Sequence, residues 1–444
     1  MSTVRCPALV VAAPSSGSGK TTVVAALARY FTLRGKKVRV FKTGPDFIDP
    51  AFLALASNQP VYQLDFWMCG EEHCHNLVAQ AAAEADLILI EGVMGMFDGK
   101  CSSADIAATL GIPVLAVIDA GKMAQTFGAV AHGLATYRCD VTMFGVFANR
   151  VASSGHSAML EASLPESLTY LGYLPKDAQV CLPERHLGLV QAQELSDIEA
   201  RLDQAARLLA EHTDIALPPV VEFELSSQTL NPANQLEKNT ANSLKGRRIA
   251  IAKDAAFSFI YPANTELLQQ LGAQLCYFSP VRGERLPECD ALYLPGGYPE
   301  LYLTELADNS ALKEDIHQHV NANKPLLAEC GGMLYLNRTL TDSQGNCAEM
   351  CSVLSADSVM QSRLAALGLV EGELLPGETL RGHTFHYSTT CSQERQRCQP
   401  ISQRGKPLDP VWIKGNLVAS YIHWYFPFNP GLVAKLFLGQ GDIA

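Results

Sequence analysis

A glycine-rich loop between a short apolar strand and a helix is the feature that most constrains the fold of this chain. Residues 8–13 form an apolar run, residues 14–22 read PSSGSGKTT, and residues 21–34 follow a helical pattern. In this context the glycines let backbone N–H groups turn toward phosphate oxygens, the lysine reaches the β- and γ-phosphates, and the first threonine ligates Mg²⁺. The loop therefore predicts a site for ATP and Mg²⁺. The nucleotide-binding candidates are Gly17, Gly19, Lys20, Thr21 and Thr22.

Two positions of this loop depart from related phosphate-binding loops. Pro14 stands where the first glycine is usual. Ser15 stands five residues before Lys20, where the phosphate-loop ATPases that act as dimeric switches carry a second lysine. The serine favours a metabolic enzyme over a switch.

Short apolar strands alternate with helical segments over the first half of the chain, which predicts a parallel, doubly wound α/β sheet in residues 1–225. Residues 226–246 are rich in Ser, Asn, Gln and Thr and are interpreted as a linker. A new strand at 248–252 begins a second α/β domain, residues 247–444. The further strands expected in the first domain are 37–41, 87–90, 114–118 and 143–147.

Acidic side chains follow two of the predicted strands. The chain reads GPDFIDP after the second strand and EGVMGMFDG at the end of a later one. Because ligands of open parallel sheets bind at the carboxyl ends of the strands, Asp46 and Glu91 are expected to approach the Mg²⁺ beside Thr21. Asp49 and Asp98 are expected further out, facing a second substrate. Each acid alone also fits a helix cap or a turn.

The second domain carries a candidate nucleophile. Cys330 lies between a predicted strand and a helix and is followed by glycine, which is the geometry of a nucleophile elbow. A helix N-terminus there favours the thiolate. His423, on a predicted strand near the C-terminus, is the candidate base. Backbone N–H groups of Gly296, Gly297 and Gly331 are candidates for binding an oxyanion.

Charge and cysteine content narrow the function class. The chain has 34 Lys and Arg against 45 Asp and Glu, a net charge of −11, which argues against a nucleic-acid protein with a broad basic face. Thirteen cysteines, an odd number, indicate reduced thiols in a cytoplasmic protein. No run of about 20 uncharged apolar residues is present, so no membrane span is expected.

The cluster Cys69, His73, Cys74 and His75 fits a helix start better than a metal site, because no second cluster follows.

Taken together, these motifs resemble the cobyrinic acid a,c-diamide synthase family, ATP-dependent amidotransferases that use glutamine. The resemblance covers nearly the whole chain outside the linker. It implies a dethiobiotin-synthetase-like phosphate-loop domain followed by a class I glutamine amidotransferase domain with a flavodoxin-like fold. The segments that carry it are 44–50, 91–99, 182–188, 381–388 and the elbow at Cys330.

This resemblance implies a reaction for each domain. The C-terminal domain hydrolyses glutamine through a thioester on Cys330, with His423 as base. In the N-terminal domain ATP phosphorylates an acetate carboxylate of a tetrapyrrole, and ammonia displaces phosphate to leave an amide. Asp46 and Glu91 would complete the metal site, and Asp49 and Asp98 would place the carboxylate or the ammonia. The resemblance also suggests a homodimer, on which the composition is silent.

Two departures from the family pattern keep alternatives open. Class I amidotransferases usually have an acid two residues after the histidine, and here that residue is Tyr425. The segment after Asp98 is also short, which keeps sirohaem or nickel-sirohydrochlorin open as a substrate. Because the family motifs do not read the central metal, hydrogenobyrinic acid also remains an alternative to cobyrinic acid. A regulatory phosphate-loop protein without catalytic activity is a second alternative, supported only by the missing acid.

Overall fold

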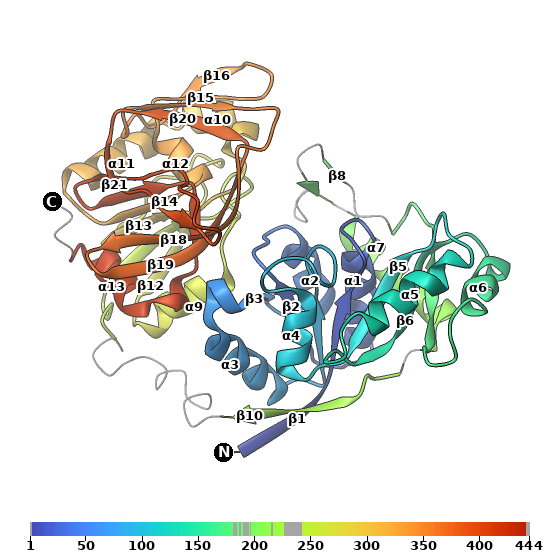
Figure 1. Cartoon of the computed structure of the whole chain (residues 1–444). Helices are drawn as coiled ribbons and strands as arrows, with labels where there is room; N and C mark the ends of the chain where they lie inside the picture. The colour runs from blue at the N-terminus through green and yellow to red at the C-terminus, as the bar shows by residue number, and fades with distance from the viewer. Residues whose placement is uncertain are drawn as a thin grey trace. The chain divides into compact units, whose positions relative to one another are not determined.

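A computed structural model describes residues 2–180, 184–185, 188–189, 195, 197–214, 216–225 and 242–440 of the chain. It separates into two compact units, residues 1–231 and 232–444. Most of the predicted linker, residues 226–241, lies outside the described residues, as do four residues of the 182–188 segment. The two units are described separately below (Figure 1).

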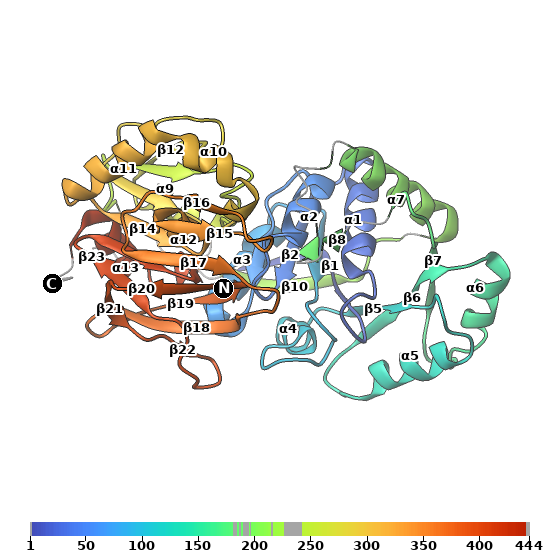
Figure 2. The same cartoon turned by 90° about the horizontal axis from the view of Figure 1, so that it is seen from above.

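The first unit is built on an eight-stranded sheet with the order β3-β2-β4-β1-β5-β6-β7, and β10 pairs with the first part of β1. All pairs along the main path are parallel, while β10 runs antiparallel to residues 2–7. Helices α1, α2 and α7 lie on one side of the sheet and α4 and α5 on the other (Figure 2). The predicted doubly wound parallel sheet is confirmed.

The elements of this unit agree in type with the expected strands and helices. The helices are α1 (Lys20–Thr32), α2 (Asp49–Ser57), α3 (Glu71–Ala82), α4 (Ser103–Leu110), α5 (Thr126–Thr136), α6 (Ser154–Glu161) and α7 (Ile198–His212). The strands are β1 (Ser2–Ala12), β2 (Val38–Thr43), β3 (Tyr62–Leu64), β4 (Leu87–Glu91), β5 (Val114–Asp119), β6 (Met143–Val151), β7 (Tyr170–Pro175), β8 (Glu184–Arg185), β9 (Gly188–Leu189) and β10 (Val220–Leu225).

The strand register brings polar residues into one row near the carboxyl ends of the strands. Gln63 of β3 pairs with Lys42 of β2, Lys42 pairs with Glu91 of β4, and Glu91 pairs with Val11 of β1. Because the phosphate loop follows β1 directly, this row lies next to the start of α1. The register therefore places a buried lysine between a carboxylate and an amide at the ligand edge of the sheet.

The second unit contains a seven-stranded sheet, β12-β11-β13-β14-β24-β23-β21, and a smaller sheet, β22-β18-β19-β25. A third sheet, β16-β15-β17-β20, lies at the end of the unit where β15 and β16 are labelled (Figure 1). The helices are α9 (Pro262–Gln270), α10 (Leu303–Asp308), α11 (Ser310–Asn321), α12 (Gly331–Leu336) and α13 (Pro430–Leu438).

The strands of the second unit are β11 (Arg248–Ala252), β12 (Gln274–Phe278), β13 (Ala291–Leu294), β14 (Leu326–Glu329), β15 (Thr339–Thr341), β16 (Cys347–Glu349), β17 (Ala356–Met360), β18 (Ala366–Leu375), β19 (Glu378–His386), β20 (Ser388–Ser392), β21 (Arg395–Cys398), β22 (Ile401–Ser402), β23 (Val411–Lys414), β24 (Leu417–Ser420) and β25 (Ile422–Trp424).

Alternation of strands and helices, expected to continue to the C-terminus, stops after α12. From residue 339 to 424 the described chain forms strands, and α13 follows only at 430. Glycines with positive φ at 345 and 377 provide the tight turns of the β15–β16 and β18–β19 hairpins, and Gly405 turns the chain back after β22. The α/β fold class is confirmed, but this β-rich part was missed.

The described residues contain neither a membrane-spanning helix nor a disulfide bond. None of the helices among them is long and apolar enough to cross a bilayer. The twelve cysteines that the structure describes are all free thiols.

Candidate functional site

The phosphate loop has the geometry that its sequence predicts. Gly17 and Gly19 adopt φ values of 76° and 87°, which favour glycine. A Cβ at Gly19 would lie 1.9 Å from the side-chain nitrogen of Asn149, so only glycine fits there. That nitrogen donates to the carbonyl of Ser18 at 2.9 Å and braces the loop from β6.

Lys20 is buried and directed into its own loop. Its Nζ donates to the carbonyls of Ser15 at 3.2 Å and Met94 at 2.7 Å. Met94 adopts a φ of 52°, a backbone conformation that residues other than glycine rarely adopt. The loop after β4 is therefore strained at the residue whose carbonyl accepts from Lys20. Burial lowers the pKa of Lys20 to about 8.

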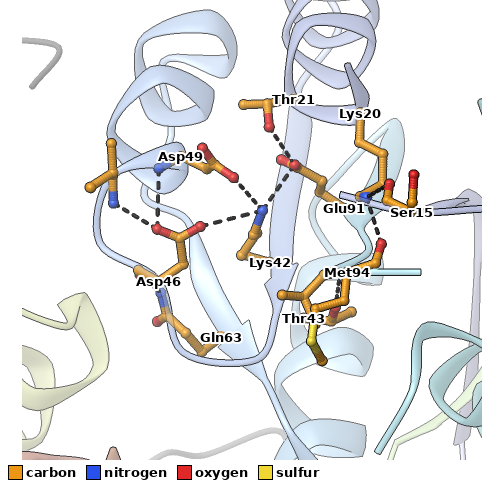
Figure 3. Close-up of polar contacts among 12 residues, drawn as sticks. Ser15, Lys20, Thr21, Lys42, Thr43, Asp46, Asp49, Gln63, Glu91 and Met94 are labelled. Atoms are coloured by element: carbon orange, nitrogen blue, oxygen red, sulfur yellow. Dashed lines mark hydrogen bonds and ion pairs between the residues drawn. The ribbon is translucent and has the colours of Figure 1, made fainter. Parts of the chain in front are cut away.

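Lys42 is the centre of the acidic cluster. Its Nζ lies 2.5 Å from Asp49 Oδ2, 2.9 Å from Glu91 Oε1 and 3.4 Å from Asp46 Oδ2, and Figure 3 shows the ammonium among the three carboxylates. The lysine side chain is 3% exposed. The hydroxyl of Thr21 donates to the same Glu91 oxygen at 2.7 Å. The cluster thus connects directly to the phosphate loop.

The electrostatics of this cluster follow from burial and from the single cation. Burial opposes a charged Lys42, but the carboxylates of Asp49, Glu91 and Asp46 raise its pKa well above its ordinary value. Burial likewise opposes ionisation of Asp49, yet Lys42 lowers its pKa. Burial and the neighbouring Asp49 raise the pKa of Asp46 to about 7, and burial raises that of Glu91. Three acids therefore share one tethered positive charge.

Asp98 lies outside this cluster but near the phosphate loop. Its Oδ2 accepts from the backbone nitrogen of Gly95 at 2.9 Å, and a Cβ at Gly95 would lie 2.8 Å from the carbonyl of Pro14. The carboxylate also acts electrostatically on Lys20. Its exposed position fits the expectation that Asp98 faces a second substrate, which remains a prediction.

The structure brings Thr21, Asp46 and Glu91 together as expected. Asp49, which was expected further out, lies in the same cluster, 2.5 Å from Lys42. Sequence reasoning missed Lys42. The signal was present, since a lysine that follows the apolar residues 40–41 one position before the end of a strand is unusual in a core. What the sequence could not give is the register that pairs Lys42 with Glu91. A buried lysine needs paired charge, so this position could have been flagged beside the two acids that follow it.

The low pKa of Lys20 predicts a pH dependence of nucleotide binding. As pH rises above about 8 the ammonium loses its proton and its attraction for phosphate. We expect the Kd for ATP to rise by up to roughly tenfold per pH unit above that point. Calorimetric titrations between pH 7 and 9.5 would measure this rise. Lys20→Arg, which stays charged throughout, should bind ATP without this pH dependence, and equal pH dependence in both proteins would contradict the assignment.

Cys330 forms a strained elbow in the second unit. It follows β14 with φ 41° and ψ −107°, and its backbone nitrogen donates to the carbonyl of Ser420 at 2.7 Å. A Cβ at Gly331 would lie 3.0 Å from the backbone nitrogen of Gly297, and one at Gly332 would lie 2.1 Å from the carbonyl of Leu294. The two glycines therefore allow the elbow to approach the loop that carries the predicted oxyanion donors.

His423 faces the elbow across Gly296. A Cβ at Gly296 would lie 2.2 Å from Cε1 of His423 and 3.3 Å from the Cβ of Cys330. Only a glycine at this position leaves space between the two side chains. The structure thus brings together Cys330, His423 and all three glycines predicted to surround them.

The resting pair is neutral rather than ionic. Burial, and next the charge of Glu300, raise the pKa of Cys330 to about 12. Burial lowers the pKa of His423 well below its ordinary value, with smaller contributions from His383 and His386. The raised pKa of Cys330 is opposite to the lowered pKa that the helix N-terminus was expected to produce. Desolvation of the buried thiol outweighs the effect of a six-residue helix.

Tyr425, which stands in place of the expected acid, is a core residue. Its ring packs edge-on against Tyr261 at 5.6 Å and its backbone nitrogen donates to the carbonyl of Arg381. A different acid, Glu329, lies just before the elbow. Its carboxylate accepts from the hydroxyl of Tyr293 and from the backbone nitrogen of Trp424, and burial raises its pKa to about 8.

Cys69, His73, Cys74 and His75 do not form a metal centre. Cys69 lies in a single π-helical turn, Phe66–Gly70, and the other three lie in the first two turns of α3. Among the described residues no group of three or more His, Cys, Asp or Glu side chains is arranged to hold a metal ion.

Two family models match this chain, one within each compact unit. Residues 9–190 match the model of the CobQ/CobB/MinD/ParA nucleotide binding domain. Residues 248–430 match the CobB/CobQ-like glutamine amidotransferase domain. The first range contains the phosphate loop and the Lys42 cluster, and the second contains Cys330 and His423.

Curated relatives are similar over their full length. Hydrogenobyrinate a,c-diamide synthase of Stutzerimonas stutzeri is 53% identical over 98% of this chain and 99% of its own length. The protein of the same name from Pseudomonas aeruginosa is 52% identical over 100% of both chains. Cobyrinate a,c-diamide synthase of Herminiimonas arsenicoxydans is 43% identical over 97% of this chain and 96% of its own. The chain therefore belongs to the family of cobyrinate and hydrogenobyrinate a,c-diamide synthases.

Proposed function

We propose that this chain is a carbon–nitrogen ligase that converts the a and c acetate side chains of a corrin ring into amides, using ATP and glutamine, in cobalamin biosynthesis. The observation that carries the proposal is identity of 52–53% with two diamide synthases over essentially the full length of each chain. The phosphate loop with its carboxylate cluster and the Cys330 elbow supply the two half-reactions that such an enzyme needs.

The relatives favour a cobalt-free ring as substrate. The two at 52–53% identity are named for hydrogenobyrinate, whereas the one at 43% is named for cobyrinate. We therefore propose hydrogenobyrinic acid as the preferred substrate, with cobyrinic acid as the competing one. The reaction itself is the same for both, because the carboxylates that react lie at the edge of the ring.

Thr21 and Glu91 fit the Mg²⁺ that accompanies ATP. Glu91 Oε2 is buried and has no hydrogen-bond partner among the described residues, while Oε1 already accepts from Thr21 and Lys42. A hard cation prefers such carboxylate and hydroxyl oxygens. Asp46 is the third predicted ligand, although Oδ1 accepts from backbone nitrogens and Oδ2 faces Lys42. When bound, the ion would neutralise phosphate charge.

The residues of the first unit then have distinct tasks. Backbone groups of the phosphate loop and Lys20 hold the triphosphate, which requires Lys20 to leave the carbonyl of Met94. The substrate carboxylate attacks the γ-phosphorus, ADP leaves, and an acyl phosphate forms. Ammonia displaces phosphate to give the amide. Lys42 holds Asp46, Asp49 and Glu91 in place throughout, and Asp49 and Asp98 orient the acid or the ammonia.

The second unit supplies the ammonia. The neutral imidazole of His423 accepts the proton of Cys330 as sulfur attacks the amide carbon of glutamine. Backbone N–H groups of Gly297 and Gly331 stabilise the oxyanion. The proton returns to the leaving nitrogen, and water then hydrolyses the thioester to glutamate.

A side-by-side assay tests the proposal. Hydrogenobyrinic acid, cobyrinic acid and sirohaem are each incubated with ATP, Mg²⁺ and glutamine, and product mass gives the number of amides added. We expect two amides on hydrogenobyrinic acid and a higher kcat/KM for it than for cobyrinic acid. Amidation of sirohaem alone would overturn the substrate, and no turnover with any of the three would favour a regulatory protein without catalysis.

A further inference from the structure

The proposed base has a second imidazole stacked on it. His383 of β19 and His423 of β25 are paired in register in the small sheet. Their ring centroids are 4.9 Å apart and their planes differ by 21°. Both rings are buried, so the face of His423 is fixed by a rigid neighbour rather than by solvent.

Tyr261 fixes the orientation of that neighbour. Its hydroxyl lies 2.8 Å from Nδ1 of His383, and all of the residue except 1% is buried at the start of α9. The ring of Tyr425 packs against the same tyrosine at 5.6 Å. The residue that replaces the expected acid therefore supports the Tyr261–His383 pair.

We propose that His383, held by Tyr261, is a positioning residue for His423 and does the orienting that an acid at position 425 would otherwise do. This inference rests on the proposed role of His423 as base. Carboxylates in such triads hold the imidazole in the correct orientation and stabilise its charged form. A stacked, anchored ring provides the first of these effects without the second.

The other groups that face His423 agree with a base that starts neutral. His386, on the same strand as His383, is stacked on Tyr421 at 3.6 Å and pairs with Asp409 at 3.3 Å. Glu329 of β14 holds the backbone nitrogen of Trp424. Cys330 approaches across Gly296. A positive charge among these buried groups would be costly, so the proton is held on His423 only during the reaction.

Three variants separate ring stacking from the tyrosine anchor. His383→Ala removes both, His383→Phe keeps a stacked ring, and Tyr261→Phe removes the hydroxyl alone. Glutaminase kcat should fall by about 10²-fold in His383→Ala and by about tenfold in the other two, with glutamine KM changed less than about twofold. Thr384→Val is the matched control, because Thr384 is buried on the opposite face of the same strand.

Alkylation of Cys330 distinguishes positioning from a structural role. Iodoacetamide labelling of the Cys330 peptide, followed by mass spectrometry from pH 6 to 11, reports how well His423 removes the thiol proton. In His383→Ala we expect alkylation near neutral pH to slow and the profile to move to higher pH than in the parent, because a misoriented His423 accepts the thiol proton less well. A lower active fraction with an unchanged profile would overturn the inference. Full glutaminase activity in His423→Asn would instead overturn the proposed base.

Discussion

The substitution Lys42→Met should strongly reduce amidation while leaving glutamine hydrolysis intact. The substitution leaves three carboxylates around a site from which the ammonium that pairs with all of them has been removed. We expect amidation kcat to fall by roughly 10²–10³-fold, as when one preorganised charge is removed from a phosphoryl-transfer site. The free energy of unfolding should fall by about 3–5 kcal/mol, the usual cost of breaking a buried ion pair. Product assays and urea denaturation measure the two effects.

The pH dependence of this variant has a definite sign. Without Lys42 the pKa of Asp49 in the folded chain rises above its value in the unfolded chain, which is near 4, and the pKa values of Asp46 and Glu91, already raised by burial, rise further. The folded state then binds more protons, so the stability deficit grows as pH rises above about 4 and shrinks on acidification. Asp49→Asn added to Lys42→Met should recover part of the loss.

Arg29→Met is the matched control for Lys42. Arg29 is also a buried cation of the first unit, paired with Glu199 at 3.1 Å and Asp203 at 2.7 Å. It bridges α1 to α7 and lies outside the acidic cluster. We expect it to reduce stability but to leave amidation within about threefold of the parent. Amidation by Lys42→Met at the level of this control would exclude Lys42 from the reaction.

The second large effect is expected for Cys330→Ala. Glutamine-dependent synthesis should fall on the order of 10⁴- to 10⁶-fold, which is the cost of removing a catalytic nucleophile. Synthesis with added ammonium chloride should continue, because the first unit retains its phosphate loop and acidic cluster. Rates with each nitrogen donor, measured on the same corrin substrate, provide the comparison.

Cys289→Ala controls for the loss of a buried thiol. Cys289 lies 3.8 Å from Nδ1 of His319, so it is a second buried cysteine–histidine pair in the same unit. Cys289 lies before β13 and is not at a strand-to-helix turn like that of Cys330. We expect glutamine-dependent synthesis to be retained in this variant. Loss in both variants would show that thiol burial, not nucleophilic attack, explains the effect.

Local patterns made much of the first unit predictable. The strand, loop and helix around Lys20 are specified by adjacent residues, and the acids after β2 and β4 follow from the same alternation. Lys42 was missed because its role depends on register with β4, a contact between residues 49 positions apart. Its neighbours in sequence, Phe41 and Thr43, gave no indication of the carboxylates around it.

The second unit was harder to predict for the same reason. The elbow at Cys330 was recognised from a strand followed by two glycines. The antiparallel strands from 339 to 424 were not, since short strands with turns lack the long helical patterns that distinguish α/β units. His383 lay in a recognised segment, but its contact with His423 exists only because β19 and β25 pair.

The nucleophile and its proposed base belong to different sheets of the second unit. Cys330 directly follows β14 of the seven-stranded sheet, whereas His423 lies on β25 of the sheet β22-β18-β19-β25. The pair is therefore assembled only after both sheets have formed and packed. Glutaminase activity would report late folding of this unit, and a partly folded chain released early in synthesis would carry a thiol without its base. Such a chain could not waste glutamine before the enzyme is complete.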